Sequence, residues 1–313
     1  MNKNDKILIT GGKGMVGSIL YEELLRLGYW NVISIGRNDC DLINSNMVMD
    51  LFDRVKPDYV FHLAARVGGI NANNTMSGIF IYENLMIQCN VFEAARICNV
   101  RKLLFCGSVC VYPKECPQPI KEEYLMTSKL ESTNSAYAVA KIAGIEMCKA
   151  YNKQYGSNFI TVMPPNLYGE GDYFNPMNSH VIPGLFFKFN EAVMNKENMI
   201  TVWGTGNVKR EFLYVEDLVG ALIFLMNTYD SSDHINIGSG KIISIKDLVN
   251  IIKDIFKYEG NILWDTSFPE GVKERVSDVS KINKLGWEAK TEIKEGLQKT
   301  YKWFMDNYQY IRK

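Results

Sequence analysis

Thr10-Gly-Gly-Lys-Gly-Met-Val-Gly17 follows the strand-like run Lys6–Thr10 and leads into a helical pattern over residues 15–27. Its glycines Gly11, Gly14 and Gly17 are spaced as GxxGxxG, which is weak evidence alone but strong evidence at the first turn between a strand and a helix. Glycines there let the backbone approach a pyrophosphate, and the helix N-terminus offers free N–H groups and a positive dipole end. The stretch therefore predicts a dinucleotide-binding turn.

The first half of the chain continues this alternation of short strands and helices. Strands are expected at 6–10, 32–35, 59–63, 102–106 and 159–163, and helices near 15–27, 45–55, 78–98 and 135–155. Strands separated by helices at this spacing form a parallel sheet with helices on both faces. We therefore expect an α/β fold, a Rossmann-type doubly wound parallel sheet.

The character of the sequence changes after residue 165. Prolines and glycines punctuate a loop-rich region with little strand signal, and two further strand–helix pieces begin at Phe212 and His234. We expect a nucleotide-binding domain made of residues 1–167 plus about 209–257. The rest, about 168–208 plus 258–313, would form a smaller C-terminal α/β domain that binds the substrate.

The composition disfavours several classes of function. The 35 Lys and Arg residues balance the 35 Asp and Glu residues, so no global field attracts nucleic acid or an anionic membrane. The longest apolar run, Leu218–Met226, is far shorter than the roughly 20 residues that cross a bilayer. The seven cysteines form no CxxC pair, which argues against a disulfide framework or a zinc site. With no signal-peptide pattern after Met1, we expect a cytoplasmic protein without a metal, nucleic-acid or membrane partner.

The end of the second predicted strand indicates which dinucleotide binds. An acidic residue there takes the ribose 2′-hydroxyl of NAD, whereas this strand ends Ile35-Gly36-Arg37-Asn38. A guanidinium suits the 2′-phosphate of NADP because its planar fork matches phosphate oxygens and stays charged. Lys13 in the glycine loop would add a second positive charge. NADP(H) is the expected cofactor, although Asp39 and Asp41 leave NAD open.

Tyr137-Ala-Val-Ala-Lys141 places a phenol and an ammonium on one face of a predicted helix. A nearby cation favours the phenolate, so we expect a lowered pKa for Tyr137 and proton transfer near neutral pH. An ordinary amphipathic helix could carry YxxxK by chance. Ser108, however, follows the fourth predicted strand at the carboxyl edge of the sheet, where ligands of open α/β folds bind. Ser108, Tyr137 and Lys141 could hydrogen-bond one carbonyl oxygen during hydride transfer, which predicts an oxidoreductase.

These motifs together resemble the extended short-chain dehydrogenases/reductases, which mostly act on nucleotide sugars. The resemblance is closest to the branch of that family that epimerises and reduces GDP-4-keto-6-deoxymannose, and it covers essentially the whole chain. It rests on TGxxGxxG, Ser108 and YxxxK, and on further stretches: Leu63-Ala-Ala-Arg-Val-Gly-Gly-Ile70, Asn73-Asn-Thr75, Ser108-Val-Cys-Val-Tyr-Pro-Lys114, Tyr137-Ala-Val-Ala-Lys-Ile-Ala-Gly-Ile145, Pro165-Asn-Leu-Tyr-Gly169, Asn178-Ser-His-Val-Ile-Pro183 and Arg210-Glu-Phe-Leu213.

The resemblance implies an NADPH-dependent enzyme that carries out 3,5-epimerisation and 4-keto reduction of a GDP-4-keto-6-deoxy sugar. Cys110 and His180 match the family's acid/base pair for the epimerisation; the alternatives are a buried core thiol and a histidine that merely starts a helix. Thiol and imidazole groups exchange protons at neutral pH after modest pKa shifts. A homodimer formed through the helices near 78–98 and 135–155 is also implied.

The resemblance further implies which residues bind the ligands. Those for GDP are Lys188, Trp203, Arg210 and Arg275, where Lys188 replaces a frequent arginine, Arg275 replaces a frequent lysine, and Trp203 could instead be a core aromatic. Those for the cofactor are Gly11, Lys13, Gly14, Met15, Val16, Gly17, Arg37, Asp41, Leu42, Leu63, Ala64, Ala65, Lys141, Pro164, Asn166, Leu167 and His180.

Three other interpretations stay open. A reductase of this family could act at C4 only, on a GDP-4-keto-heptose or related sugar that a separate enzyme has already epimerised. A 4,6-dehydratase or 4-epimerase would hold NAD tightly, which Arg37 argues against. A scaffold or redox sensor could use the same domain only to bind NADP, which the joint presence of Ser108, Tyr137 and Lys141 disfavours.

Overall fold

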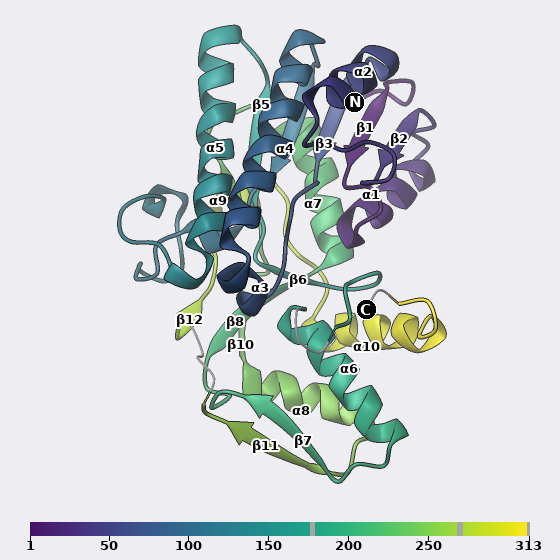
Figure 1. The fold of residues 1–313 in the computed structure, drawn as a ribbon, viewed down its shortest axis with the longest axis vertical. Coiled ribbons are helices and arrows are strands. Elements are labelled where there is room, and N and C mark those ends of the chain that lie inside the picture. Colours follow the sequence, from purple (N-terminus) through teal and green to yellow (C-terminus); the bar gives the residue numbers. More distant parts are fainter. Residues whose placement is uncertain (176–178, 268–271, 312–313) are drawn as a thin grey trace.

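The computed structural model describes residues 1–175, 179–267 and 272–311, which form two lobes (Figure 1). Within these residues, the larger lobe is built on a six-stranded parallel sheet of order β2-β1-β3-β4-β5-β9. Its strands are β1 Ile7–Thr10, β2 Val32–Ile35, β3 Tyr59–His62, β4 Lys102–Cys106, β5 Phe159–Met163 and β9 Ile235–Asn236. The strands expected in the first half of the chain are confirmed.

Helices cover both faces of this sheet, because alternate side chains of each strand point to opposite faces. Leu8 of β1 packs in a core with α2, α4 and α5, whereas Ile7 and Ile9 pack in a second core with α1 and α7. The predicted doubly wound α/β fold is therefore confirmed. These helices are α1 Met15–Arg26, α2 Ser45–Val55, α4 Ser77–Ile97, α5 Ser135–Tyr155 and α7 Val215–Thr228.

The smaller lobe lies below the sheet in Figure 1 and has its own hydrophobic core. Its strands are β6 Asn166–Tyr168, β8 Lys209–Tyr214, β10 Ile242–Ser244 and β12 Glu274–Arg275, with β7 Met199–Trp203 and β11 Asn261–Asp265 as a separate pair. Its helices are α6 Val181–Met194, α8 Ile245–Ile255 and α10 Ile293–Asp306. Short helices α3 Ile70–Thr75 and α9 Ser280–Lys284, with the 3-10 turns η1 Val109–Val111, η2 Glu122–Tyr124 and η3 Ser132–Asn134, complete the described elements.

The segment 209–257, expected to belong wholly to the nucleotide-binding domain, is divided between the lobes. Strand β8 pairs with β6, β10 and β12 in the smaller lobe, and α8 packs in that lobe's core, whereas α7 and β9 join the larger lobe. Phe212 and Tyr214 of β8 point into the smaller core and Leu213 points into the larger one. Both faces of β8 are thus buried, each in a different core. Its hydrophobic pattern therefore could not predict which sheet the strand joins.

Helix α6 begins at Val181, inside the region after residue 165 that the prolines and glycines marked as loop-rich. Pro183 lies in the first turn, where a backbone N–H has no partner within the helix in any case. Ile182, Leu185, Phe186 and Phe189 are buried on one side of α6, so the helix is stabilised by packing in the smaller core.

The apolar run Leu218–Met226 lies inside α7, where Leu218, Leu222 and Leu225 are fully buried in the larger lobe. Its hydrophobicity therefore serves the protein core. No helix among the described residues is both long and apolar enough to span a membrane.

Candidate active site

Ser108 and Cys110 meet at the carboxyl end of β4, where the sheet gives way to the turn η1. The Ser108 side chain caps this turn by accepting a hydrogen bond from the Cys110 N–H at 3.3 Å. Its Oγ lies 3.0 Å from the Cys110 Sγ. The Val109 N–H donates to the Pro164 carbonyl at 3.0 Å, which ties the turn to the end of β5. The hydroxyl and the thiol are thus held side by side at the ligand-binding edge of the sheet.

Tyr137 and Lys141 lie one turn apart near the start of α5, beside Ser108 and Cys110. The Lys141 Nζ donates to the Cys106 carbonyl at 2.8 Å and lies 5.9 Å from the centre of the Tyr137 ring. It also lies 4.6 Å from the centre of the Phe105 ring, and the side chain is buried. A backbone carbonyl and an aromatic ring therefore fix the ammonium near the phenol.

The pKa of Tyr137 is raised well above its ordinary value, chiefly by burial and further by the neighbouring thiol groups of Cys110 and Cys106. A hydrogen bond with Ser108 acts in the opposite direction but does not outweigh burial. Burial also lowers the pKa of Lys141. The expectation of a lowered Tyr137 pKa was wrong, because burial of the phenol raises its pKa by more than the hydrogen bond with Ser108 lowers it. A protonated phenol at neutral pH suits a proton donor to a carbonyl oxygen.

Cys110 and His180 differ in how they are placed. Burial raises the pKa of the Cys110 thiol, while the Ser108 hydrogen bond and the cations Arg275 and Lys141 lower it. His180 forms the N-cap of α6 at an exposed position, and desolvation of the imidazole by the surrounding atoms lowers its pKa. Among the described contacts, no hydrogen bond joins His180 to Ser108, Cys110 or Tyr137. Asn178 of the same motif lies outside the described residues.

The glycine loop lies between β1 and β3, where backbone crowding requires glycine. Gly11 has a φ of +74°, and a Cβ there would lie 2.7 Å from the Ala64 backbone nitrogen. A Cβ at Gly17 would lie 2.4 Å from the Gly11 carbonyl oxygen, and Gly14 forms the N-cap of α1. The loop thus brings a helix N-terminus and close backbone to the edge between two strands, as a pyrophosphate site requires.

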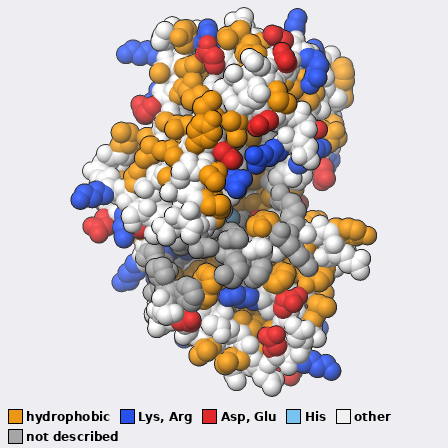
Figure 2. All heavy atoms as spheres, viewed as in Figure 1, with side chains coloured by type: hydrophobic (Ala, Val, Ile, Leu, Met, Phe, Trp, Pro, Cys, Tyr) orange, Lys and Arg blue, Asp and Glu red, His pale blue; other side chains and the backbone are white. Residues whose placement is uncertain are grey.

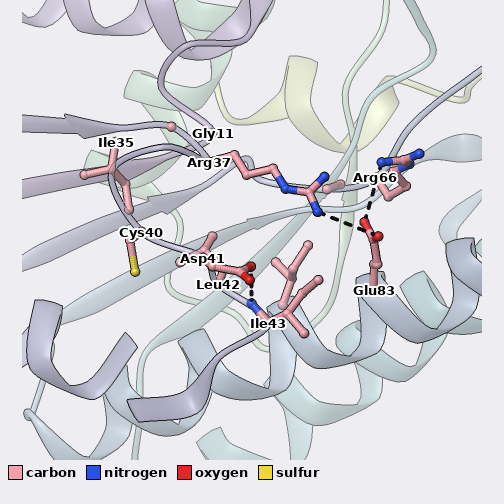
Figure 3. A pocket seen from close by; sticks show the side chains of 12 residues that line it. Gly11, Ile35, Arg37, Cys40, Asp41, Leu42, Ile43, Arg66 and Glu83 are labelled. Carbon is pink, nitrogen blue, oxygen red and sulfur yellow. Dashed lines mark hydrogen bonds and ion pairs between the residues drawn. The ribbon is translucent and has the colours of Figure 1, made fainter. Parts of the chain in front are cut away.

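A pocket opens beside this loop, and Arg37 points into it toward Glu83 (Figure 3). The Glu83 carboxylate lies 3.9 Å from Arg37 and 3.8 Å from Arg66, so two guanidinium groups share one acid. A Cβ at Gly36 would lie 2.6 Å from the Lys13 Cγ, which places Lys13 next to the same loop. The pocket is lined by Gly11, Ile35, Gly36, Arg37, Cys40, Asp41, Leu42, Ile43, Ala65, Arg66, Glu83 and Ile87.

The two aspartates near Arg37 are engaged by the loop backbone. Asp39 accepts a hydrogen bond from the Gly36 N–H at 2.8 Å, and Asp41 accepts one from the Ile43 N–H at 3.2 Å. These carboxylates shape the loop, whereas Arg37 keeps a side chain that is 66% exposed. Arg37 is therefore an exposed positive group beside the pocket.

Sequence reasoning missed Arg66 and Glu83 in this pocket. Arg66 stands in the Leu63–Ile70 stretch, which could have signalled it, but Glu83 lies within the long helix α4 among residues of no special pattern. The other cofactor candidates lie along the same edge. Met15, Val16 and Gly17 are in the first turn of α1, Leu63, Ala64 and Ala65 follow β3, and Pro164, Asn166 and Leu167 follow β5.

The candidate nucleotide residues of the smaller lobe fall into two groups. Lys188 of α6 donates to the Thr201 carbonyl at 3.0 Å and lies 5.0 Å from the centre of the Trp203 ring. Trp203 is 40% exposed at the end of β7, which rules out the alternative of a core aromatic. Arg210 and Arg275 are register partners on β8 and β12. The Arg275 guanidinium donates to the carbonyls of Val109 and Pro113, both at 3.1 Å.

Comparison with known proteins identifies the family of this chain. The sequence model of the NAD dependent epimerase/dehydratase family matches residues 7–238. A probable GDP-L-fucose synthase 1 of Oryza sativa subsp. japonica is 47% identical over 98% of this chain and 94% of its own length. The GDP-L-fucose synthase of Escherichia coli strain K12 is 42% identical over 98% of both chains.

Solved structures are also similar. A GDP-mannoheptose C4 reductase from Campylobacter jejuni, solved with NADP bound, has a TM-score of 0.89 and 38% identity, covering 97% of this chain and 99% of its own. The family resemblance predicted from the motifs is thereby confirmed. The chain belongs to the NAD dependent epimerase/dehydratase family, within which it groups with the GDP-L-fucose synthases.

Proposed function

We propose that this protein uses NADPH to convert a GDP-4-keto-6-deoxy sugar by epimerisation at C3 and C5 and reduction at C4. The observation that carries the proposal is the 3.0 Å separation of Ser108 and Cys110 beside Tyr137 and Lys141. Hydrogen-bond donors for a carbonyl oxygen and a thiol for proton exchange at carbon thus share one site. The relatives named GDP-L-fucose synthase support the choice of sugar.

Arg37 and Lys13 support NADP(H) over NAD(H) as the cofactor. Their positive charges lie beside the pocket next to Gly11, where the ribose 2′-phosphate of NADP would bind. Asp39 and Asp41 each accept one loop N–H through one carboxylate oxygen, so part of each carboxylate is used to shape the loop. Bound NADPH would supply the hydride for C4.

The proposed first reaction inverts two carbon centres. A 4-keto group acidifies the protons at C3 and C5, and inversion needs a base on one face of the ring and an acid on the other. Cys110 and His180 take these roles, since Cys110 lies next to the carbonyl-binding Ser108 and His180 starts α6 in the facing lobe. With its pKa lowered, the His180 imidazole is neutral at pH 7 and able to accept a proton.

The proposed second reaction reduces the ketone. Ser108 and Tyr137 hydrogen-bond the C4 oxygen, and Tyr137, protonated at neutral pH, gives its proton to that oxygen as the C4 carbon is reduced. Lys141 remains fixed on the Cys106 carbonyl and stabilises the negative charge left on the phenol oxygen. Lys188, Trp203 and Arg210 present cations and an exposed aromatic ring to the GDP moiety.

Isotope exchange tests both reactions in one experiment. The protein is given GDP-4-keto-6-deoxymannose and NADPH in D₂O, and the product is analysed by mass spectrometry and NMR. We expect deuterium at C3 and C5 together with NADPH oxidation. Absence of both would contradict the proposal.

The second candidate function is reduction at C4 only, acting on a GDP-4-keto-heptose or a related sugar. The similarity to the GDP-mannoheptose C4 reductase favours it, and the retained Cys110 and His180 argue against it. NADPH oxidation without deuterium uptake at C3 and C5 would favour this second candidate.

We also propose a homodimer formed through α4 and α5. Hydrophobic side chains gather over these helices (Figure 2), and the exposed ones include Ile79, Tyr82, Ile97, Val139 and Tyr155. Burying such a patch against a second copy would remove apolar surface from water. Light scattering coupled to size exclusion should give twice the chain mass of 35.7 kDa, and Tyr82→Glu should shift it to the monomer.

All seven cysteines are free, which suits the reducing cytoplasm as the proposed location.

A further inference from the structure

The guanidinium of Arg275 donates hydrogen bonds to the backbone of the catalytic turn, residues 109–113, which contains Cys110. One terminal nitrogen donates to the Val109 carbonyl and the other to the Pro113 carbonyl, each at 3.1 Å. These two carbonyls stand on either side of Cys110 in the sequence. The planar fork of arginine can bridge two acceptors at once, which the single ammonium of lysine does not do with the same geometry.

The backbone that carries Arg275 is itself fixed. Arg275 pairs with Arg210 in the register of β12 and β8. The next residues are bonded as well, since the Val276 N–H donates to the Gln118 side chain at 2.8 Å and the Ser277 N–H donates to the Glu211 carboxylate at 2.7 Å. The Arg275 side chain is therefore held at its backbone by strand pairing and at its guanidinium by two carbonyls, and it connects the smaller lobe to the turn that holds Cys110.

We propose that Arg275 is a positioning residue for Cys110: it fixes the turn from Val109 to Pro113 and so sets the thiol for proton exchange with the sugar. This inference rests on the role proposed above for Cys110. It departs from the nucleotide contact that the family resemblance implies for position 275, because the described hydrogen bonds of Arg275 go to the catalytic turn.

Charge supports the same role. The groups facing Cys110 are Ser108 in its own turn, Tyr137 and Lys141 on α5, and Arg275 on β12. Burial raises the pKa of the thiol, and Arg275 lowers it more than Lys141 does. Removing Arg275 would therefore loosen the turn and shift the thiol toward its neutral form.

The test measures the reactivity of Cys110 directly. Iodoacetamide alkylation of Cys110 is followed against pH by peptide mass spectrometry, with fragment ions distinguishing Cys110 from Cys106, because no Lys or Arg separates these two cysteines. We expect Arg275→Met to raise the midpoint pH of Cys110 alkylation by about one unit. Arg275→Lys, which keeps the charge and loses the fork, should restore most of the midpoint but not the rate of deuterium exchange at C3 and C5. Lys273→Met, at an exposed neighbouring cation, is the matched control and should change neither measurement.

GDP affinity separates this role from the alternative. A positioning residue leaves the Kd for GDP near that of the unaltered protein, whereas a diphosphate contact would weaken GDP binding by about tenfold or more when lost. Weakened GDP binding in both Arg275 variants with an unchanged Cys110 alkylation midpoint would overturn the proposal. If Arg275→Met does not fold, Arg275→Lys distinguishes the two roles. A lysine that merely contacts the diphosphate would keep normal deuterium exchange at C3 and C5 when the substrate is saturating, whereas loss of the positioning role would slow that exchange. Alkylation needs no substrate, so the two proposals can fail separately. If the unaltered protein shows no deuterium exchange but Arg275→Met still shifts the midpoint pH of Cys110 alkylation, the proposed function is contradicted and the positioning role of Arg275 is supported.

Discussion

The hydroxyl of Ser108 lies 3.0 Å from the thiol of Cys110, although the two groups are assigned to different reactions. In the proposed function, Ser108 binds the carbonyl together with Tyr137 and Lys141, and Cys110 is one member of the acid/base pair. A ketone oxygen bound at Ser108 keeps its neighbouring carbons close to the thiol. One bound orientation of the sugar can therefore serve both epimerisation and reduction, which the following variants separate.

Tyr137→Phe removes the proposed proton donor and keeps the ring. NADPH oxidation with the keto sugar should fall by about 10²–10⁴-fold, the usual contribution of a positioned acid. NADPH binding, measured by fluorescence titration, should stay near that of the unaltered protein because Tyr137 lies away from the pocket beside Gly11. Nearly full turnover in this variant would show that another group donates the proton.

Cys110→Ala and His180→Gln each remove one member of the proposed epimerising pair. We expect deuterium incorporation at C3 and C5 to fall by about 10²-fold or more in both variants. Circular dichroism should show an unchanged fold, since Cys110 is partly accessible and His180 is exposed. If deuterium still enters both carbons at the normal rate, the pair is not the acid and base.

Arg37→Ala should change the preference between cofactors. Losing a hydrogen bond to a charged group costs about 1.5–3 kcal/mol, so the KM for NADPH should rise by roughly 10- to 100-fold. The KM for NADH should change little, because NADH has no 2′-phosphate. Arg54→Ala, at an exposed arginine of α2 outside the pocket, serves as the control. Equal effects on both cofactors would contradict the assignment of Arg37.

The buried histidine His62 should make stability depend on pH. Burial lowers the pKa of His62 to about 3, and its Nδ1 is hydrogen-bonded to Thr10 at 2.7 Å. Below its unfolded pKa of about 6.5, the unfolded chain takes up a proton that the folded protein refuses until about pH 3. The contribution of His62 to the free energy of unfolding is therefore fully present above about pH 6.5. It is lost as the pH falls, and the loss amounts to about 2 kcal/mol at pH 5.

Urea unfolding at pH 7.5 and pH 5 measures this loss. His62→Gln should reduce the difference between the two pH values by about 2 kcal/mol. His234, whose pKa burial lowers to about 4, should contribute in the same direction through His234→Gln. A difference that persists in full in both variants would assign the pH dependence to carboxylates.

Much of the larger lobe could be predicted because its signals are local. The strands Ile7–Thr10 and Lys102–Cys106 and the helix Ser135–Tyr155 follow from hydrophobic runs and turn glycines within a few residues of each element. The glycine spacing was equally legible, since Gly11 and Gly17 stand where a Cβ would collide with backbone. The division of residues 209–257 between the lobes could not be predicted from the sequence. Phe212 and Leu213 are neighbours on one strand and both are buried, but they lie in different cores.

The sequence by itself determined the Rossmann-type sheet, the glycine loop and the order in which Ser108, Tyr137 and Lys141 occur, since periodicity and turn chemistry are properties of neighbouring residues. Only the tertiary structure decided which groups meet. The Lys141 ammonium bonds a carbonyl 35 positions away and the Tyr137 pKa rises, and Arg275 reaches a carbonyl 166 positions away. Burial and long-range contacts depend on how the two lobes pack around the site, and no local pattern encodes that packing.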